Sequence, residues 1–561
     1  MFATKIKTLR TKTHIFYYLF LLLLIISCAK MGSLGGGPID REGPIVLECI
    51  PANGSINFNA HKIEIRFNEY ISLKDISNQL IVSPPINPKP EVSVSGKKVV
   101  IKLKPESLLP NKTYQLNFGN AIVDVNEGNQ LNGFVFSFST GDHIDSLQVS
   151  GTLVDALSLK PVEGAVVSLY NSHEANLFRS ELPQYLSITN KDGKFSLNNL
   201  AQGSYSIFAL KDANYNYYFD QPSEPLAFYD SLIQPGVNII ADSARSVTQY
   251  FPTDVRLHLF TEDHKKQYIT NVERSEPQYM RLVFNLPNRI TPEYSIDNYG
   301  DYLSQLSENA DTLTIWLLNE NDILRDTVSV FVKYYESYRH DSIVYDTLIA
   351  VKKTTASLLP FTKSSQKQKE LYEPYAIRFS HPIAGIETGK IGLFEDKNYN
   401  DSIVFEMQIS NNPCVVLLTA DIDGGTACRL IAEEGAFTDY YGRSTMTDSI
   451  PFTVRRLSDY GSLILILTGS DEPAFAELLQ QDKVKYKSLI TNNRIEFMNI
   501  IAGRYSIRIT HDVNNNGYWD TGNLDALQQP EPVFYYTGEY EIRSNWQHEL
   551  EWAVPFDSGN K

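Results

Sequence analysis

The chain is too long for a single hydrophobic core and too acidic for several classes of partner. It has 561 residues and a formal net charge of −16, from 50 basic and 66 acidic side chains. Several domains are therefore expected. Nucleic acid and anionic membrane surfaces are disfavoured as direct partners, because both are bound through clustered lysine and arginine.

The N-terminal segment has the features of an export signal. Four basic residues precede a continuous apolar run over residues 15–26, which is too short to span a bilayer. The run ends in Ile26-Ser27-Cys28, an order that resembles the lipobox of bacterial lipoproteins. The resemblance implies a signal peptide over residues 1–27 and a mature chain that begins at Cys28 and carries acyl chains there. An ordinary signal peptide with an incidental cysteine is the alternative.

A glycine-rich segment over residues 28–41 follows. Without apolar spacing it cannot offset the entropy of ordering, so we expect a flexible tether between lipid and the first domain. In lipoproteins of the Bacteroidota type, surface display goes with acidic residues just after the lipidated cysteine. This segment has Lys30 and no acid before Asp40. We therefore expect anchoring at the periplasmic face of the outer membrane, with the cell surface as the alternative.

From residue 42 onward the sequence alternates with the period of two that is typical of strands. Ile63, Ile65 and Phe67, for example, fall on one face of a single short segment. Glycine, proline and asparagine clusters separate such segments, and helical periodicity is nearly absent. The pattern predicts an all-β protein built from tandem β-sandwich domains.

The first of these domains has motifs along its whole length: Gly43-Pro44, Pro51-x-Asn53-Gly54, Ile65-Arg66-Phe67-Asn68-Glu69, Asp124-x-Asn126-x-Gly128-Asn129 and Phe136-Ser137-Phe138-Ser139-Thr140. With them, residues 42–141 resemble the Ig-like domain of bacterial S-layer and surface proteins. A similar strand and turn return at residues 282–287 and 377–383. We therefore predict further Ig-like sandwiches over residues 248–355 and 360–455.

A second type of domain lies between them. Its motifs are Val149-x-Gly151, Pro161-Val162-x-Gly164, Lys191-Asp192-Gly193 and Gly203-x-Tyr205-x-Ile207. Residues 148–240 thereby resemble the carboxypeptidase regulatory-like, or transthyretin-like, domain, which implies a sandwich without peptidase chemistry. Residues 203–220 and 503–520 are identical at nine of eighteen positions without a gap. We therefore predict a divergent copy of this domain over residues 458–555.

The duplicated stretches both end in Asp-x-Asn-x-Asn-x-Tyr-x-Asp. In the later copy Asp512, Asn514, Asn516, the Tyr518 carbonyl and Asp520 match the first three quarters of an EF-hand calcium loop. The bidentate glutamate expected at its twelfth position is missing, so a calcium site here would be weak.

The earlier copy, residues 212–220, is a poorer candidate for calcium. Tyr217 stands where Gly517 gives the sharp turn, and we expect a tyrosine to resist the left-handed backbone conformation needed there. The alternative for both copies is a hairpin loop held by Asx-turns, in which Asn and Asp side chains accept hydrogen bonds from nearby backbone N–H groups.

Two cysteines flank a predicted hairpin turn at residues 421–425. Cys414 and Cys428 lie at equal distances from the start of that turn, so they could face each other across two strands. An exported protein meets an oxidising compartment, which favours a disulfide. Two separate buried thiols are the alternative.

Asp followed by Ser or Thr and then an aliphatic residue or Ala occurs nine times. The tripeptide resembles the acceptor for O-glycosylation in exported proteins of Bacteroidota, and Ser146, Ser342 and Ser402 are the best candidates because polar loops precede them. The alternative is simple strand entry, in which Asp ends a loop and the next two residues begin a strand.

Motifs for catalysis are missing from the sequence. No two histidines have the spacing of a shared metal site, and there is no nucleophile elbow, Walker loop or dinucleotide glycine motif. The chain as a whole resembles the Ig-like-domain lipoproteins of Bacteroidota. We therefore expect no enzyme and no cofactor, but a lipid-anchored cell-envelope scaffold for protein interactions at the outer membrane. The alternatives are a glycan-binding accessory lipoprotein, suggested by the many tyrosines, and an enzyme whose carboxylates converge from distant positions.

Overall fold

The computed structural model describes residues 40–556 except 132, 173, 243–244, 264–265, 298–300, 338–341, 354–360, 397, 469–471 and 491. Cys28, the signal peptide over residues 1–27 and nearly all of the tether lie outside these residues. The chain forms two compact units that divide at residue 144, with residues 83–85 grouped with the second. Among the described residues no helix has the length and apolar character needed to cross a membrane.

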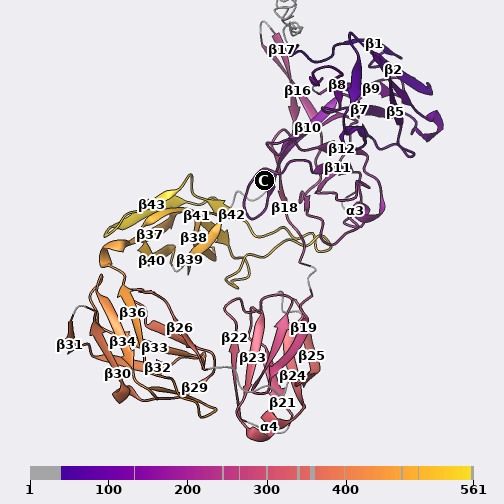
Figure 1. The fold of residues 1–561 in the computed structure, drawn as a ribbon. Helices are drawn as coiled ribbons and strands as arrows, with labels where there is room; N and C mark the ends of the chain where they lie inside the picture. The colour runs from indigo at the N-terminus through magenta and orange to yellow at the C-terminus, as the bar shows by residue number, and fades with distance from the viewer. Residues whose placement is uncertain are drawn as a thin grey trace, which may run out of the picture. The chain divides into compact units, whose positions relative to one another are not determined.

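The first unit is one sandwich, the first sandwich (Figure 1). One sheet has the order β1 (Val46–Ile50), β2 (Lys62–Phe67), β6 (Lys98–Lys102), β5 (Glu91–Ser95), and another has β4 (Ile81–Ser83), β7 (Thr113–Asn117), β9 (Val135–Ser139). A small sheet pairs β3 (Ile71–Leu73) with β8 (Ile122–Asp124), and the helices are α2 (Ile76–Gln79) and η1 (Pro105–Ser107). Ile63, Ile65 and Phe67 lie in its buried core as the alternation predicts.

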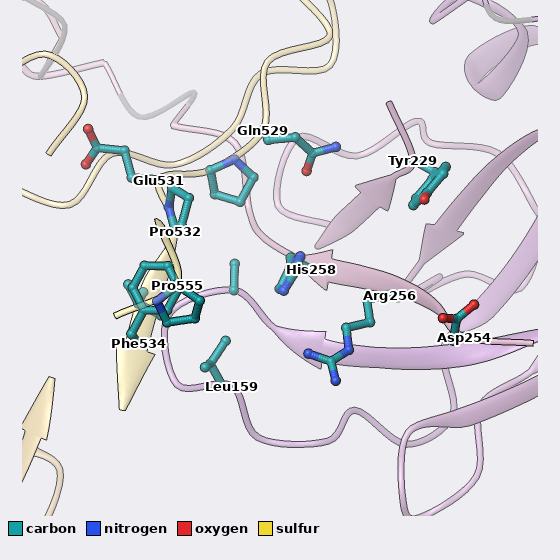
Figure 2. A pocket seen from close by; sticks show the side chains of 13 residues that line it. Leu159, Tyr229, Asp254, Arg256, His258, Gln529, Glu531, Pro532, Phe534 and Pro555 are labelled. Carbon is teal, nitrogen blue, oxygen red and sulfur yellow. The ribbon is translucent and has the colours of Figure 1, made fainter. Parts of the chain in front are cut away.

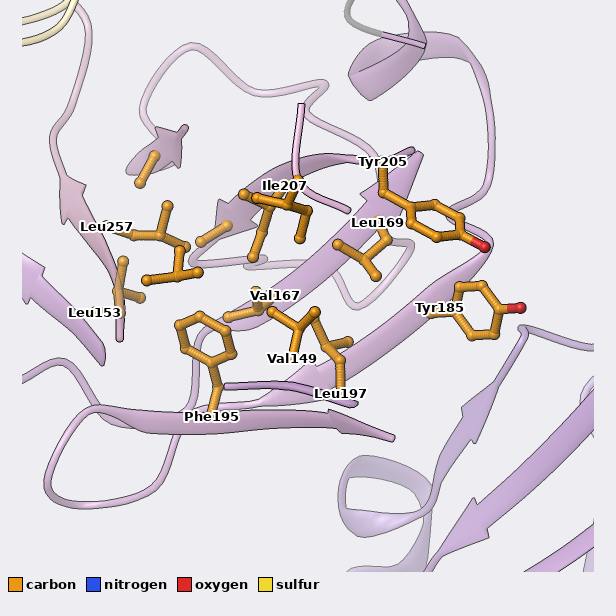
Figure 3. Close-up of a cluster of buried hydrophobic side chains, with 14 of the residues drawn as sticks. Val149, Leu153, Val167, Leu169, Tyr185, Phe195, Leu197, Tyr205, Ile207 and Leu257 are labelled. Atoms are coloured by element: carbon orange, nitrogen blue, oxygen red, sulfur yellow. The ribbon is translucent and has the colours of Figure 1, made fainter. Parts of the chain in front are cut away.

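The second sandwich has sheets β13-β10-β18 and β12-β11-β14-β15. Their bounds are β10 (Leu147–Asp155), β11 (Val166–Tyr170), β12 (Tyr185–Ile188), β13 (Lys194–Leu200), β14 (Ser206–Leu210), β15 (Leu226–Phe228) and β18 (Val255–Leu259). The helix α3 (Leu177–Ser180) and the hairpin β16 (Gly236–Asp242) with β17 (Arg245–Phe251) complete it. Figure 3 shows its core, where Val149, Val167, Phe195 and Ile207 from both sheets meet.

The boundary predicted after this sandwich is wrong. The sequence analysis ended it at residue 240 and gave residues 248–355 to the next domain, but β18 pairs in parallel with β10, from Gly151 opposite Val255 to Asp155 opposite Leu259. A side chain at Gly151 would overlap the Val255 carbonyl, with 2.1 Å between Cβ and oxygen. The second sandwich therefore ends near residue 260, because a parallel strand needs a long crossover that local pattern does not reveal.

The third and fourth sandwiches follow. The third has β19 (Ile269–Glu276), β20 (Tyr279–Phe284), β21 (Glu293–Ile296), β22 (Tyr302–Leu306), β23 (Thr312–Leu317), β24 (Thr327–Tyr335), β25 (Ile343–Val351) and α4 (Glu320–Leu324). The fourth has β26 (Lys363–Ser365), β27 (Gln368–Lys369), β28 (Tyr375–Phe379), β29 (Ile383–Ile386), β30 (Ile391–Glu395), β31 (Asn398–Ser402), β32 (Phe405–Ile409), β33 (Val415–Ala420), β34 (Ala427–Ala432), β35 (Phe437–Asp439), β36 (Asp448–Val454) and η2 (Thr388–Lys390).

Each of these two sandwiches encloses one core between its sheets. The sheets of the third are β19-β20-β23-β22 and β21-β24-β25. Those of the fourth are β26-β28-β33-β32 and β27-β36-β34-β30-β31, with a small sheet β29-β35. The pair β29-β35 matches β3-β8 of the first sandwich, since buried Asp439 and buried Asp124 each accept backbone N–H groups from the turn that follows.

The fifth sandwich repeats the second. Its sheets β40-β37-β44 and β39-β38-β41-β42 comprise β37 (Tyr460–Thr468), β38 (Ala474–Gln480), β39 (Lys483–Leu489), β40 (Arg494–Ile501), β41 (Gly503–His511), β42 (Val533–Tyr535) and β44 (Gln547–Ala553), with β43 (Tyr540–Ile542) beside β41 and η3 (Leu457–Asp459) at the entry. As β18 does beside β10, the last strand β44 pairs in parallel with β37. The prediction of a duplicated sandwich is in accord with this shared topology.

Candidate functional site

The duplicated loops adopt the same hydrogen-bonded arrangement. In each, the first aspartate is buried and accepts backbone N–H groups of its own loop. Asp512 accepts from Asn516, at 2.9 Å, and from Gly517, at 2.7 Å. Asp212 accepts from Tyr215, at 2.7 Å, and from Tyr217, at 2.8 Å. The carboxylate therefore takes the place of the backbone acceptors that a regular turn would supply.

The polar side chains that alternate along each loop converge on its last aspartate. In the later copy the amides of Asn514 and Asn516 both donate to Oδ2 of Asp520, each at 2.7 Å. In the earlier copy the amide of Asn216 donates to Oδ2 of Asp220 at 2.6 Å. The predicted residues are thus brought together, but they bind one another.

A third carboxylate, missed by the sequence analysis, closes each loop. Glu531 accepts the backbone N–H of Val513 at 2.8 Å and that of Asp520 at 3.0 Å. In the same way Glu224 accepts the N–H groups of Ala213 and Gln221. Both glutamates precede a proline just before a short strand, β15 or β42, and this Glu-Pro pair was the available signal. An alignment of the two copies at the constant offset of 300 residues does not reveal this glutamate, because the later copy has extra residues after Asp520.

Burial raises the pKa of Glu531, the glutamate that closes the later loop. Only 6% of Glu531 is exposed. Removal from water, with smaller contributions from the charges of Asp520 and Asp512, raises the pKa of the Glu531 carboxyl to about 7, and its two backbone donors oppose the rise. This carboxyl therefore titrates near neutral pH, in contact with both ends of the loop.

The expectation that Tyr217 resists the left-handed conformation is wrong. Its φ is +67°, close to the +75° of Gly517, and its N–H donates to Asp212 as that of Gly517 does to Asp512. The hydrogen bond offsets the strain of a tyrosine in this region. The two copies therefore share a backbone despite the substitution.

The contacts are those of the Asx-turn alternative. Within the part of the chain that the structure describes, no group of three or more His, Cys, Asp or Glu side chains is arranged to hold a metal ion. The oxygens of Asp512 and of Asp520 are instead occupied by N–H and amide donors of the loop. The Tyr518 N–H donates to Asn516 at 2.7 Å, which adds a further turn of this type.

The later loop also holds neighbouring sandwiches. The extra residues carry Leu524 into an apolar cluster on the outer face of sheet β12-β11-β14-β15, among Phe208, Phe228 and Phe260. There the Leu524 N–H donates to Glu262 at 2.6 Å. On the corresponding outer face of the fifth sandwich, Arg508 stands at the position equivalent to Phe208 and pairs with Glu477 at 2.6 Å.

Further contacts extend this junction in the second unit. Gln529 donates to Asp230 at 2.6 Å and to the Phe228 carbonyl at 2.8 Å. Arg289 of the third sandwich lies 3.4 Å from Asp520, and its guanidinium is 4.4 Å from the ring centre of Tyr518. The loop that resembled a metal site therefore joins three sandwiches.

The predicted disulfide is not formed. Cys414 and Cys428 are free, buried thiols. Cys414 precedes β33 and packs beside Trp316, whereas Cys428 lies on β34, opposite Phe452 of β36. β33 and β34 belong to different sheets, so the turn between them crosses the sandwich and does not form a hairpin. Burial raises the pKa of both thiols, to about 12 for Cys414 and about 11 for Cys428.

The predicted glycosylation acceptors lie at strand boundaries. Ser146 and Ser402 are exposed and Ser342 is half-buried. Ser146 precedes β10, Ser342 precedes β25, and Ser402 ends β31. Both the acceptor and the strand-entry interpretations stay open on these positions.

Comparison with known proteins assigns part of the chain. A family model described as bacterial Ig-like domain matches residues 40–140, which confirms the domain predicted over residues 42–141. No curated protein matches the chain.

Solved structures match at low identity. The major pilin subunit BcpA of Bacillus cereus is 12% identical, over 72% of this chain and 99% of that chain, with a TM-score of 0.17. The S-layer protein SbsC is 11% identical, over 90% and 68%, with a TM-score of 0.15. A segment of Escherichia coli alpha-2-macroglobulin is 10% identical, over 45% and 95%, with a TM-score of 0.16. Scores this low carry no argument about function.

The prediction of an all-β, multidomain chain is confirmed by the strands, the separate sheets and the family match together. Residues 40–140 match the model of a bacterial Ig-like domain, and four further β-sandwiches follow within the described part of the chain.

Proposed function

We propose that the protein is a lipid-anchored scaffold of the bacterial cell envelope. Cys28 holds it at the periplasmic face of the outer membrane, and its sandwiches bind other envelope proteins. The lipobox-like segment, the tether and the Ig-like domain support this proposal. It extends to the whole chain the kind of non-catalytic role that the Ig-like architecture favours.

One observation carries the proposal: the second to fifth sandwiches form a closed circuit, in which the chain itself links the second to the third and side-chain contacts link the others. The chain passes from one to the next in order, and the loop after β41 returns from the fifth to the second through Leu524 and Gln529. A string of sandwiches joined only by linkers would move freely. A closed circuit is stiffer, as a scaffold that fixes the positions of its partners requires.

The junctions between the third and fourth and between the fourth and fifth sandwiches are also packed. Between the third and fourth sandwiches the Tyr441 hydroxyl donates to the Leu317 carbonyl at 3.1 Å, and Cys414 packs against Tyr279 and Trp316. The buried Cys414 is therefore part of the junction between the third and fourth sandwiches.

Between the fourth and fifth sandwiches, Glu370 binds two partners. Arg455, at the end of the fourth, pairs with it at 2.9 Å, and the Tyr460 hydroxyl from β37 of the fifth donates to it. The Leu371 N–H donates back to the Tyr460 hydroxyl at 3.0 Å. These contacts hold the short connection between the two sandwiches.

Two experiments test the proposal. Cys28→Ala should leave an unprocessed precursor without labelled fatty acid, and a normally processed, unlabelled mature band in both proteins would contradict lipid anchoring. Affinity purification of the full chain from native envelopes in mild detergent, followed by mass spectrometry, should recover a reproducible set of envelope proteins. Recovery of glycans without such proteins would instead favour the accessory glycan-binding function, and a chain that co-purifies with neither would refute the scaffold.

A further inference from the structure

A cavity of about 440 Å³ lies where the second and fifth sandwiches meet (Figure 2). One wall is β18. Because strand side chains alternate, Asp254, Arg256 and His258 share the face that lines the cavity, while Val255 and Leu257 point into the core of the second sandwich. One face of β18, together with the residue before the strand, therefore presents three ionisable groups to a single space.

The opposite wall is apolar and stiff. It is formed by Pro530, Pro532 and Pro555 with Phe534, all from the fifth sandwich. Figure 2 shows Pro532, Pro555 and Phe534 on the side of the cavity away from Asp254. Proline rings have a fixed backbone angle, so this wall is preorganised and loses little freedom when a ligand covers it.

The polar wall holds a cation that the protein does not neutralise. Among the described residues, Arg256 forms no ion pair and no hydrogen bond through its side chain. His258 lies two residues further on the same face, and burial, with the positive charge of Arg256, lowers the pKa of its imidazole. His258 is then neutral at neutral pH and offers one donor and one acceptor, so the positive charge of the site belongs to Arg256.

The acids at the cavity do not cancel that charge. The Glu531 carboxylate accepts the N–H groups of Val513 and Asp520, and in Figure 2 it points away from Arg256. Asp254 directly precedes β18 and lies two residues from Arg256, about 7 Å along the extended chain. Asp230, whose charge also acts on His258, accepts the side-chain amide of Gln529 at 2.6 Å. A ligand anion in the cavity can therefore meet the guanidinium.

The duplicated sandwich shows that this arrangement is specific to the junction. Pairing with the duplicated strands places Val255 of β18 and Leu550 of β44 at equivalent positions. Arg256 then corresponds to Glu551, and His258 to Ala553. The fifth sandwich keeps the strand but lacks both groups, so the fold itself does not require them.

We propose that this cavity binds a small monocarboxylate with an apolar body, whose carboxylate meets the Arg256 guanidinium and whose body packs against the proline wall. Arg offers a planar fork of donors that fits a carboxylate. The volume is in the range of small-molecule sites. This function is separate from the scaffold role and stands or falls independently of it.

Calorimetric titration of the mature chain tests the proposal with hexanoate, hexanamide, hexylammonium and acetate as probes. Hexanoate should bind saturably at millimolar concentration. Hexanamide should bind about tenfold more weakly or worse, because it lacks the charge-assisted bond. Acetate should also be weaker, because it lacks the apolar body. Hexylammonium should show no binding.

Arg256→Ala should weaken hexanoate binding by about tenfold or more, and Arg256→Lys should retain part of the affinity because it keeps the charge without the fork. Arg504→Ala, which removes an exposed arginine from the fifth sandwich instead of the second, is the matched control and should bind hexanoate as the unmodified protein does. Unchanged melting temperatures without ligand establish that the variants fold. Lack of saturable hexanoate binding, equal binding of the amide or the ammonium, or unchanged binding by Arg256→Ala would each overturn the proposal.

Discussion

Leu524→Ala tests whether the fifth sandwich is locked to the second. Leu524 is fully buried in a cluster whose other walls come mainly from the second sandwich, among them Phe228 and Phe260. Truncating a leucine in a rigid core costs about 2–5 kcal/mol. In Leu524→Ala the loss of stability cannot exceed the free energy of docking, because the loop detaches as soon as detachment costs less free energy than keeping the cavity.

The remaining contacts set the scale of this loss. Glu262, at 2.6 Å from the Leu524 N–H, and Thr261, whose carbonyl accepts from Thr521 at 2.7 Å, still hold the loop in the variant. We therefore expect the low end of the range, about 2–3 kcal/mol. Opening of the junction should then be about 30- to 150-fold more frequent.

Hydrogen exchange measured by mass spectrometry on the full chain provides the assay. Peptides that contain β15 and peptides from residues 519–529 should both exchange faster in Leu524→Ala, while peptides from the first sandwich should not change. Leu527→Ala is the matched control, since Leu527 packs only partly against the same cluster. Equal exchange in the unmodified protein and in Leu524→Ala would refute the docked arrangement.

Four other outcomes follow from the same contacts. Because the folded-state pKa of Glu531 is raised to about 7 from an ordinary 4.5, its contribution to the free energy of unfolding is complete below pH 4.5 and is lost as the pH rises through 7. In urea titrations the protein should therefore lose about 3 kcal/mol more than Glu531→Gln between these two pH values. If the two proteins show the same pH dependence, burial does not raise the pKa of Glu531. Gly517→Ala should lower the free energy of unfolding by about 1–2 kcal/mol, since φ is +75° there, and an unchanged urea midpoint would show that the turn relaxes. The melting temperature should be the same in millimolar calcium and in chelator, because the carboxylates at residues 512–520 already bind loop donors, and a rise with calcium would restore the metal-site interpretation. Cys414 and Cys428 should both react with a thiol reagent after denaturation without reductant, whereas two unreactive thiols would indicate the disulfide.

Local sequence pattern was sufficient to predict those parts of the fold that depend on residues close together in the chain. The alternation of Ile63, Ile65 and Phe67 identified a buried strand face, and the repeated loop located the fifth sandwich. The sequence pattern did not predict contacts between residues far apart in the chain. Assignment of β18 to the second sandwich depends on parallel pairing with β10, and separation of the two cysteines depends on a turn that crosses between sheets.

The candidate site shows the same division. The spacing of Asn514, Asn516 and Asp520 indicated that these side chains act together, but it did not predict that both amides donate to Asp520, and Glu531 was hidden by the extra residues before it. Those residues carried their own signal, since Leu524 and Leu527 are large apolar side chains in a largely polar loop. An apolar side chain there indicates a surface elsewhere to receive it, although the sequence does not name that surface.

The return of the loop to the second sandwich has a consequence for the order in which the chain can mature. Gln529 lies 301 residues beyond Phe228, whose carbonyl it binds. The second sandwich is synthesised before the fifth, and its outer aromatic face stays exposed to water until the residues around Leu524 have been made. The last sandwich therefore covers a surface of an earlier one only when synthesis is nearly complete, and a chain truncated before residue 524 would expose these aromatic side chains and be prone to aggregate.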